Sequence, residues 1–405
     1  MKLMIVLQNL VIFRSNWANL VSEDQHILLI TSNTGLLSLG SNKPYFNHII
    51  VSEPYSFENV SQNLSDFLST HSYSLDNIRV LCNDEYLLPL AARVREHFNI
   101  IGDKLIDILK FTNKITMKEK IADQIKLPKY IQHTPQKYHS SESYLTEIIN
   151  YLSLPIIAKP TNLAACDGVV KITSKEELEK WLLENKESEN YELDEYVEGT
   201  LYHIDSIIQD NKVLSVFIGK YSSPVAEFLM GKPNGTILLS YEDKDYLKLI
   251  EFNQSVLNAM GNLPNCVTHL EVFINDKGEA VFLEIAARAA GGMIPQMYQK
   301  AFNLHIEEIH FKLQMEKKDI YIPNSLNSYV AWLWFPKKEG KYLNKSAELL
   351  INSDYTTCWD VDEKTPQTEV SSIRDRIGGI MIENKDLYQL NKDFYWLCHH
   401  YEPYK

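Results

Sequence analysis

Two glutamates, Glu271 and Glu284, stand in a stretch whose residue pattern predicts a β-hairpin. Runs of alternating apolar residues flank the turn-forming segment Asn275–Gly278, so a hairpin is expected over residues 267–288. Two carboxylates that converge in apolar surroundings are costly unless a cation lies between them. Carboxylates are also the hard oxygen ligands that Mg²⁺ prefers. The pair therefore predicts an Mg²⁺ site with room for the phosphate oxygens of a nucleotide.

The register of this hairpin determines whether the two carboxylates can meet. A turn centred within Asn275–Gly278 pairs Glu271 with Phe282 and His269 with Glu284. Alternation then places Glu271, Phe282 and Glu284 on one face, with the glutamates as diagonal neighbours roughly 7–8 Å apart at the backbone. The alternative is a register slipped by one residue, which turns one glutamate toward solvent.

Cations and glycines around the predicted hairpin favour phosphate chemistry. Arg288 lies just past the second strand, where its guanidinium can hold a transferring phosphoryl group or a substrate carboxylate. Gly291 and Gly292 allow the backbone to approach a ligand closely. Lys114 and Lys159 precede the hairpin, and each stands at the end of a predicted element. Either lysine alone is most simply a solvated side chain.

The elements that would position these residues begin with a parallel α/β arrangement. Over the first ~110 residues, apolar bursts alternate with amphipathic helical segments, which is typical of a parallel sheet. No GxGxxG motif follows the first strand, so a dinucleotide fingerprint is absent. The expected strands are 4–13, 26–32, 48–52 and 78–82, and the expected helices are 56–71 and 89–98. Further along, 154–160 is expected as a strand and 191–208 as a strand, a hinge and a strand.

Composition sets the broad class. A chain of 405 residues with 45% apolar and 11% aromatic residues predicts two or three compact units. The net charge of -13 argues against a nucleic-acid partner. Five cysteines without CxxC spacing indicate a reducing compartment rather than a disulfide framework or zinc site. No apolar stretch reaches the ~20 residues of a membrane span, and the first apolar run reads as a buried strand rather than a signal peptide. We therefore expect a soluble, cytoplasmic protein.

The whole pattern resembles the ATP-grasp superfamily. Its metal signature is similar to Glu271 followed by Glu284-Ile-Ala-Ala-Arg288 and a Gly-Gly pair, preceded by two lysines. The resemblance spans roughly residues 80–385. It implies an ATP-grasp fold in the α/β class, with an N-terminal parallel α/β (pre-ATP-grasp) domain, a small central lid and a C-terminal mixed α+β domain. The expected ranges are 1–112, 113–205 and 206–405.

The resemblance also implies roles for particular residues. In the family, two lysines hold nucleotide phosphates, and Lys114 and Lys159 occupy the matching places. A hinge segment reads the adenine edge through its backbone, while acidic side chains meet the exocyclic amine and the ribose. The segment LDEYVEG (193–199) resembles this hinge, and by position it nominates Asp194, Glu195, Val197 and Glu198.

Two departures from the family pattern stand out. Many relatives have a glycine-rich phosphate loop, whereas the segment Thr161–Gly168 contains a single glycine, so fewer backbone N–H groups can bind an anion. The usual asparagine of the metal motif is Ala286, which cannot ligate, and this leaves open whether one or two metal ions bind. Cys166 lies in the phosphate loop without a partnering base, so we do not expect a nucleophile there.

Three further residues are candidates for the sites. His203 and Asp205 alternate on the strand after the hinge and can line the ATP site, although a lone histidine is more often structural. Glu227 lies in the loop-like segment 222–236, which is expected to border the substrate cavity. A substrate amino group is its expected partner.

These features predict a magnesium-dependent ligase that joins a carboxylate to an amine through an acyl-phosphate. ATP and Mg²⁺ are the expected cofactors, with Mn²⁺ as an alternative ion, and Arg288 is the expected catalytic residue. Arg288, Gly291 and Gly292 would also contact the substrate. Within the superfamily, the chain looks most similar to bacterial L-amino-acid ligases, which form dipeptides. A ligase of another acid, such as a purine-pathway or natural-product precursor, and a nucleotide-binding protein without turnover stay open. The expected partners are small molecules, neither nucleic acid nor membrane, and a homodimer stays open.

Overall fold

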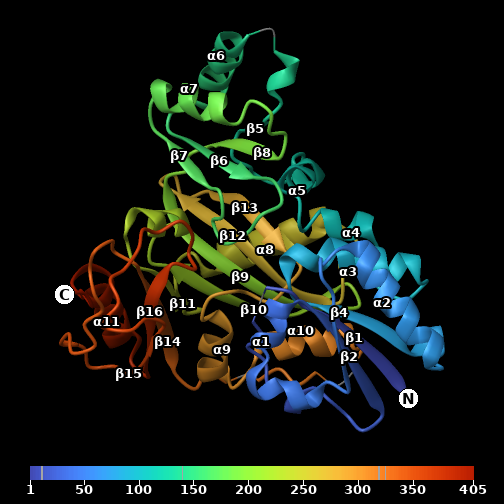
Figure 1. The fold of residues 1–405 in the computed structure, drawn as a ribbon. Coiled ribbons are helices and arrows are strands. Elements are labelled where there is room, and N and C mark those ends of the chain that lie inside the picture. The colour runs from blue at the N-terminus through green and yellow to red at the C-terminus, as the bar shows by residue number, and fades with distance from the viewer. Residues whose placement is uncertain (11, 139, 318–319, 324) are drawn as a thin grey trace.

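The chain folds into three β-sheets that follow one another along the sequence (Figure 1). The computed structural model describes residues 1–10, 12–138, 140–317, 320–323 and 325–405. The N-terminal sheet is parallel, the small central sheet and the large C-terminal sheet are antiparallel, and helices pack on all three. This layout confirms the predicted class and its three-part arrangement. Within the described ranges, no helix has the length and apolar character needed to cross a membrane.

The N-terminal sheet has the strand order β3-β2-β1-β4, with helices on one face and irregular segments on the other. Its strands are nearly continuous apolar runs because both faces are buried. The strands are β1 (Lys2–Leu7), β2 (Gln25–Thr31), β3 (His48–Val51) and β4 (Ile78–Cys82). The helices are α1 (Asn33–Leu37), α2 (Phe57–Thr70), α3 (Leu88–His97) and α4 (Leu105–Leu109), with the 3-10 turns η1 (Trp17–Asn19), η2 (Gly40–Tyr45), η3 (Leu75–Asn77) and η4 (Glu85–Leu87).

A helix from the C-terminal part of the chain completes the core of this sheet. Two residues make this contact: Phe311 of α10 (Ile306–Gln314) and Met315, which directly follows the helix. They pack with Trp17 against the face of β1 and β2 that α2 and α3 leave free. In Figure 1, α10 accordingly lies beside β1 and β2. Because the two regions share one core, the loops at the carboxyl ends of the N-terminal strands are fixed relative to the C-terminal sheet.

The central sheet, with its two helices, stands above the large sheet in Figure 1, and we call this part (residues 130–195) the lid. Its strand order is β5-β8-β6-β7, and α6 and α7 pack on one face through Leu145, Ile148 and Trp181. The elements are β5 (Tyr130–Gln132), η5 (Pro135–Lys137), α6 (Ser141–Leu152), β6 (Ile156–Pro160), β7 (Val170–Ile172), α7 (Lys175–Glu184) and β8 (Tyr191–Glu195).

The large sheet, which with its helices we call the body, has the order β13-β12-β9-β10-β11-β14-β16-β15. One face of β9, β12 and β13 packs on α5 and α8, which leaves the other face of these strands toward the lid and α9. The strands are β9 (Gly199–Gln209), β10 (Lys212–Tyr221), β11 (Asn234–Leu238), β12 (Cys266–Asn275), β13 (Ala280–Ala286), β14 (Tyr329–Pro336), β15 (Asp354–Trp359) and β16 (Arg376–Asn384). The other elements are α5 (Lys114–Ile121), η6 (Val225–Met230), α8 (Tyr246–Met260), α9 (Ile294–Phe302), α10 and α11 (Leu387–His399).

The expected boundary at residue 205 lies inside a strand. The lid sheet ends with β8 at Glu195, and β9 belongs to the body along its whole length from Gly199. The sequence 191–208 has alternating apolar residues throughout, so its pattern does not show that the chain changes sheets. The short segment 196–198 is where the change takes place.

Candidate active site

The two predicted metal ligands lie directly opposite each other on the β12–β13 hairpin. Glu271 pairs with Glu284, not with Phe282, and Phe282 pairs with Val272 on the opposite face, in the core under α8. Two local features change the predicted register. The loop has three residues with Gly278 at φ +74°, and the pairing shifts again where Leu283 forms a β-bulge.

The bulge explains how both carboxylates reach the cleft. Val272 pairs with Phe282 while Glu271 pairs with Glu284, so Leu283 is the extra residue on β13. Without it, Glu284 would follow the alternation of Phe282 and face the core. Bulges of this kind redirect side chains near functional sites. The expectation that Glu271 and Glu284 share one face is met, but through direct opposition rather than a diagonal.

The surroundings of the glutamates suit a cation. Tyr221 donates its hydroxyl hydrogen to Glu271 Oε1 at 2.7 Å, and Lys114 Nζ lies 3.3 Å from Glu284 Oε2. Burial opposes ionisation of Glu284, but Lys114 and Lys159 outweigh it and hold the pKa of Glu284 at about 2. The two carboxylates face one point, and their oxygens are the ligand type for Mg²⁺. The residues present fit the predicted metal site.

Lys159 belongs to a buried ion cluster that also contains Lys118, Glu192 and Asp194. Lys159 Nζ lies 2.8 Å from Asp194 and 3.2 Å from Glu192, and Lys118 Nζ lies 2.6 Å and 3.1 Å from the same two carboxylates. Burial lowers the pKa of Lys159, but Asp194 and Glu192 outweigh it and raise the pKa above the ordinary lysine value. The cluster thus sets two lysines against two carboxylates.

A cleft between the lid and the body contains most of the expected nucleotide residues. Lys114, Lys159, Asp194, Glu195 and Val197 line it. Its floor is an apolar cluster of the body strands, with Leu201, Phe273 and Leu283. The phosphate-loop segment lines it with Leu163, Ala164, Ala165, Cys166 and Asp167.

The structure differs from the expectations for two of the hinge residues, Asp194 and Glu198. The Asp194 carboxylate is bound by the two lysines of the ion cluster, so its acidic group is occupied within the lid. Glu198 is exposed and is not among the residues that line the cleft. The alternation of β8 places Glu192 and Asp194 on the same side of the strand, facing the lysines.

The segment 161–168, which is expected to form the phosphate loop, takes its shape with a single glycine. Ala165 and Cys166 both adopt positive φ angles, 59° and 58°, which are uncommon for residues other than glycine. Burial is the main factor that raises the pKa of the Cys166 thiol, to about 12, with Glu271 and Glu284 adding to it. Cys166 is thus a neutral thiol at the cleft, as expected of a residue without a partnering base.

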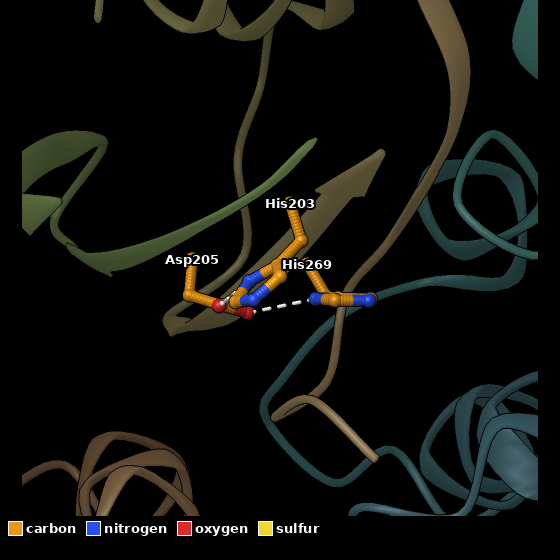
Figure 2. Close-up of side chains that lie close together, drawn as sticks. All are labelled: His203, Asp205 and His269. Atoms are coloured by element: carbon orange, nitrogen blue, oxygen red, sulfur yellow. Dashed lines mark hydrogen bonds and ion pairs between the residues drawn. The ribbon is translucent and has the colours of Figure 1, made fainter. Parts of the chain in front are cut away.

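His203 does not line the nucleotide cleft. It is fully buried in a network around Asp205, which Figure 2 shows together with His269. His203 Nδ1 lies 2.7 Å from Asp205 Oδ2, and His203 Nε2 lies 2.9 Å from the hydroxyl of Thr236. Because both ring nitrogens are engaged, the expectation that His203 binds the cofactor is wrong in this structure.

The network around Asp205 instead reaches Glu271, one of the two predicted metal ligands. His269 Nδ1 donates to Asp205 Oδ1 at 2.8 Å, and the Tyr298 hydroxyl donates to Asp205 Oδ2 at 2.6 Å. His269 Nε2 lies 3.6 Å from Glu271. Burial lowers the pKa of His269, but Asp205 and Glu271 outweigh it and raise the pKa to about 9. His203, Asp205 and His269 lie close enough together to hold a metal ion. However, the Nδ1 atoms of both histidines are already hydrogen-bonded to the Asp205 carboxylate.

We expect Asp205→Asn to lower the melting temperature, because charge-assisted hydrogen bonds to a buried carboxylate contribute about 1.5–3 kcal/mol. An amide has one acceptor oxygen where three donors now converge. Differential scanning calorimetry measures the effect, and Tyr298→Phe is the matched control, since it removes only one of the three hydrogen bonds to the carboxylate and should lower the melting temperature less. A melting curve of Asp205→Asn equal to wild type would refute the supporting role.

A second cavity of about 320 Å³ adjoins the metal site on the N-terminal side. Arg288, Gly291 and Gly292 line it as expected. Arg288 Nη2 lies 2.5 Å from Glu85, so a residue of the N-terminal region orients the expected catalytic arginine. Trp332 and Trp334 supply an apolar wall.

Glu227 does not reach this cavity. Its carboxylate lies 2.8 Å from Lys232 within the turn that contains η6, and the residue is not among those that line the cavity. The position of Glu227 on a loop between strands was correct. The loop places its neighbour Val225 at the cavity instead.

Sequence reasoning missed several residues that the structure brings to the site. Lys118 lies one helical turn from Lys114, and Glu192 precedes Asp194 by two positions on a strand, so spacing carried a signal for both. Glu85 follows a parallel strand at its carboxyl end, where sites of such sheets lie. Arg14 and His269 carried no comparable local signal.

Comparisons with known proteins agree with this geometry. No protein-family model matches the chain. The L-arginine-specific L-amino acid ligase of Bacillus subtilis is 27% identical over 257 residues, which cover 61% of this chain and 60% of that protein. The match thus spans less than two thirds of the curated relative.

Solved structures resemble the chain over almost its full length. An L-amino acid ligase from Bacillus licheniformis has a TM-score of 0.73 at 14% identity and covers 98% of this chain and 97% of its own. The ADP complex of an N5-carboxyaminoimidazole ribonucleotide synthetase has a TM-score of 0.67 at 14% identity, covering 98% and 96%. The chain therefore has the ATP-grasp fold, and it resembles L-amino acid ligases in sequence and structure.

Proposed function

We propose that this protein is an ATP-dependent ligase that joins a carboxylate to an amine through an acyl-phosphate. The observation that carries the proposal is the direct opposition of Glu271 and Glu284, with Lys114 3.3 Å from Glu284. Arg288 lies in the adjoining cavity and Lys159 in the lid cleft, so cations approach this point from two sides. Such an arrangement suits phosphoryl transfer, which depends on positioning and charge stabilisation.

The cleft under the lid is the proposed ATP site. Its apolar floor suits a purine base, and Val197 is the proposed backbone reader of the base edge, since the N–H of Glu195 already donates to the oxygen of Lys129 at 2.9 Å. Lys114 and Lys159 are the proposed phosphate ligands. A protein with the same fold was solved as an ADP complex, which supports a nucleotide as a ligand of this fold.

Glu271 and Glu284 are the proposed ligands of Mg²⁺, for which Mn²⁺ is an alternative. A divalent ion held there would neutralise charge on the nucleotide phosphates. The chain's own cations add to this effect. Arg288, oriented by Glu85, is placed to hold the phosphoryl group or the oxyanion of the acyl transfer.

The reaction has two balanced steps. A carboxylate oxygen of the first substrate attacks the γ-phosphorus, and the bond to the β-phosphate oxygen breaks to release ADP. The amine nitrogen of the second substrate then attacks the acyl carbon, phosphate leaves, and the nitrogen loses a proton. The lid would exclude water, which otherwise hydrolyses the acyl-phosphate.

L-Amino acids are the proposed substrates and a dipeptide is the proposed product. The support is the likeness to two L-amino acid ligases, one by sequence and one by structure. Ligases of other acids share the fold, and a protein without turnover would be consistent with Ala286 and the glycine-poor loop. These two alternatives are outcomes of the test below.

We expect ATP, Mg²⁺ and a suitable pair of L-amino acids to yield ADP, phosphate and a new dipeptide mass in equal amounts. Hydroxylamine with only the first amino acid should give its hydroxamate, since it traps the acyl-phosphate. Coupled ADP detection and mass spectrometry over all amino-acid pairs measure both. AMP and pyrophosphate as products would refute the mechanism. ADP release with no standard pair but with another acid would move the proposal to that acid, and nucleotide binding without release would leave a protein without turnover.

A further inference from the structure

One arginine in the cavity beside the metal site lacks an acidic partner. Arg14, Arg288, Arg374 and Arg376 all line this cavity. Arg288 pairs with Glu85 at 2.5 Å, Arg374 with an aspartate at 3.0 Å, and Arg376 with another at 2.6 Å. Within the residues that the structure describes, Arg14 forms no ion pair. Its Nε donates to the backbone oxygen of Gly292 at 3.0 Å, which leaves its remaining N–H groups for a ligand.

The segment that carries Arg14 is held in place by α10. Glu307 Oε1 accepts hydrogen bonds from the backbone N–H groups of Arg14 and Ser15, each at 2.9 Å, and from the Ser15 hydroxyl at 2.8 Å. Asn42 fixes the same segment by donating to the backbone oxygen of Ser15 at 3.0 Å. The guanidinium is therefore presented by a rigid support, which reduces the entropy lost when a ligand binds.

The electrostatic setting of Arg14 favours an anion. Burial lowers the pKa of its guanidinium, Glu307 raises it, and the nearby cations Arg288 and Arg376 lower it further. A partly buried cation near other cations is stabilised by an anion placed between them, and a guanidinium matches the planar geometry of a carboxylate. Trp332 and Trp334 line the same cavity, so a ligand with an apolar part fits beside the charge.

The proposed reaction requires two separate places for carboxylates if the amine substrate is an amino acid. One carboxylate reacts at the metal site near Lys114 and Arg288, whereas the carboxylate of the amine substrate must be kept from reacting. We propose that Arg14 binds this free carboxylate and thereby selects amino acids or peptides over simple amines as the second substrate. The inference rests on the proposed ligase function.

The test compares the second amino acid with its amide, which lacks the negative charge of the carboxylate. For the wild-type enzyme and an amino-acid pair that releases ADP, kcat/KM is measured for the second amino acid and for its uncharged amide. Wild type should prefer the acid, and Arg14→Gln should reduce this preference about 10- to 100-fold, the value of one charge-assisted hydrogen bond. Most of the change should lie in KM of the acid. Arg14→Lys should restore part of the preference.

Two controls separate a binding role from a structural one. Arg93→Gln removes an exposed arginine that stacks on Phe57 of the N-terminal domain, 4.0 Å from its ring, and should keep the wild-type preference. Hydroxamate formation from the first amino acid reports the first step and the folded state of each variant. An equal loss of hydroxamate formation in Arg14→Gln would mean that Arg14 serves the first substrate or the fold, and would overturn the proposal.

The other outcomes are also decisive. An unchanged preference in Arg14→Gln, with active wild type, would overturn the role of Arg14 and leave the ligase function standing. If wild type released no ADP with any amino acid as second substrate, the proposed function itself would fail, and this inference with it.

Discussion

Replacing Glu284 with glutamine is expected to reduce ADP formation by roughly a thousandfold, while the protein stays folded. Glu284 and Glu271 face each other across a bulged pair of strands, and an amide in place of one carboxylate removes half of the anionic charge that would hold Mg²⁺. The loss of a metal's contribution of several kcal/mol corresponds to a rate effect of this size. Steady-state ADP release, measured over a range of Mg²⁺ concentrations, gives the rate and the apparent metal affinity.

The same hairpin supplies the control. Glu279 is an exposed glutamate beside the hairpin loop, and it pairs with Lys126 outside the cleft. Glu279→Gln should therefore keep wild-type ADP release. Circular dichroism and melting temperature establish that both variants are folded. Wild-type activity in Glu284→Gln at low Mg²⁺ would eliminate the proposed metal site.

Removing either lysine of the buried ion cluster should destabilise the lid, but only one of the two should contact the nucleotide. Lys118→Met leaves Glu192 and Asp194 buried with a single cation, and an uncompensated buried charge costs about 3–5 kcal/mol. Lys159→Met leaves the same imbalance, and it also removes a side chain that lines the cleft. Amide protection in the lid, measured by hydrogen exchange, should fall by about two to four orders of magnitude in both.

Nucleotide binding distinguishes the two lysines. At a temperature where both lids remain folded, Lys159→Met should weaken ATP binding by a further 1.5–3 kcal/mol, roughly, relative to Lys118→Met. Isothermal calorimetry measures this difference. Lys120→Met, at an exposed position on the same helix as Lys118, should leave protection and affinity as in wild type. Equal ATP affinities of Lys118→Met and Lys159→Met would assign Lys159 to stability alone.

The sequence allowed good prediction of elements whose signal is local. Short apolar runs identified the strands of the N-terminal sheet, and alternating apolar residues identified the hairpin of Glu271 and Glu284, because the hydrophobic pattern reflects burial directly. The register of that hairpin was wrong because a three-residue loop and the bulge at Leu283 each move the pairing by one residue. Neither the loop length nor the bulge can be read from the hydrophobic periodicity of the sequence.

Contacts between distant segments could not be predicted in the same way. Arg14 contacts Gly292 and Glu85 contacts Arg288, although the residues of each pair are far apart in the sequence. Both contacts depend on how the N-terminal sheet packs against α10. His203 was assigned to the cofactor because alternation alone does not reveal whether a side chain faces a cleft or a packed helix. Here α9 covers that position and Tyr298 shares its aspartate. Such assignments depend on tertiary packing, which one sequence does not contain.

The location of the buried ion cluster restricts how the lid can swing. Lys118 belongs to α5, which packs on the core of the body, while Asp194 lies near the end of β8, just before the chain returns to the body at Gly199. Both segments that connect the lid to the body thus pass close to the buried ion cluster. A motion that keeps these contacts must rotate about an axis running near them. In such a rotation the far end of the lid, with α6 and α7, moves furthest, and Lys159, which belongs to the ion cluster, moves least.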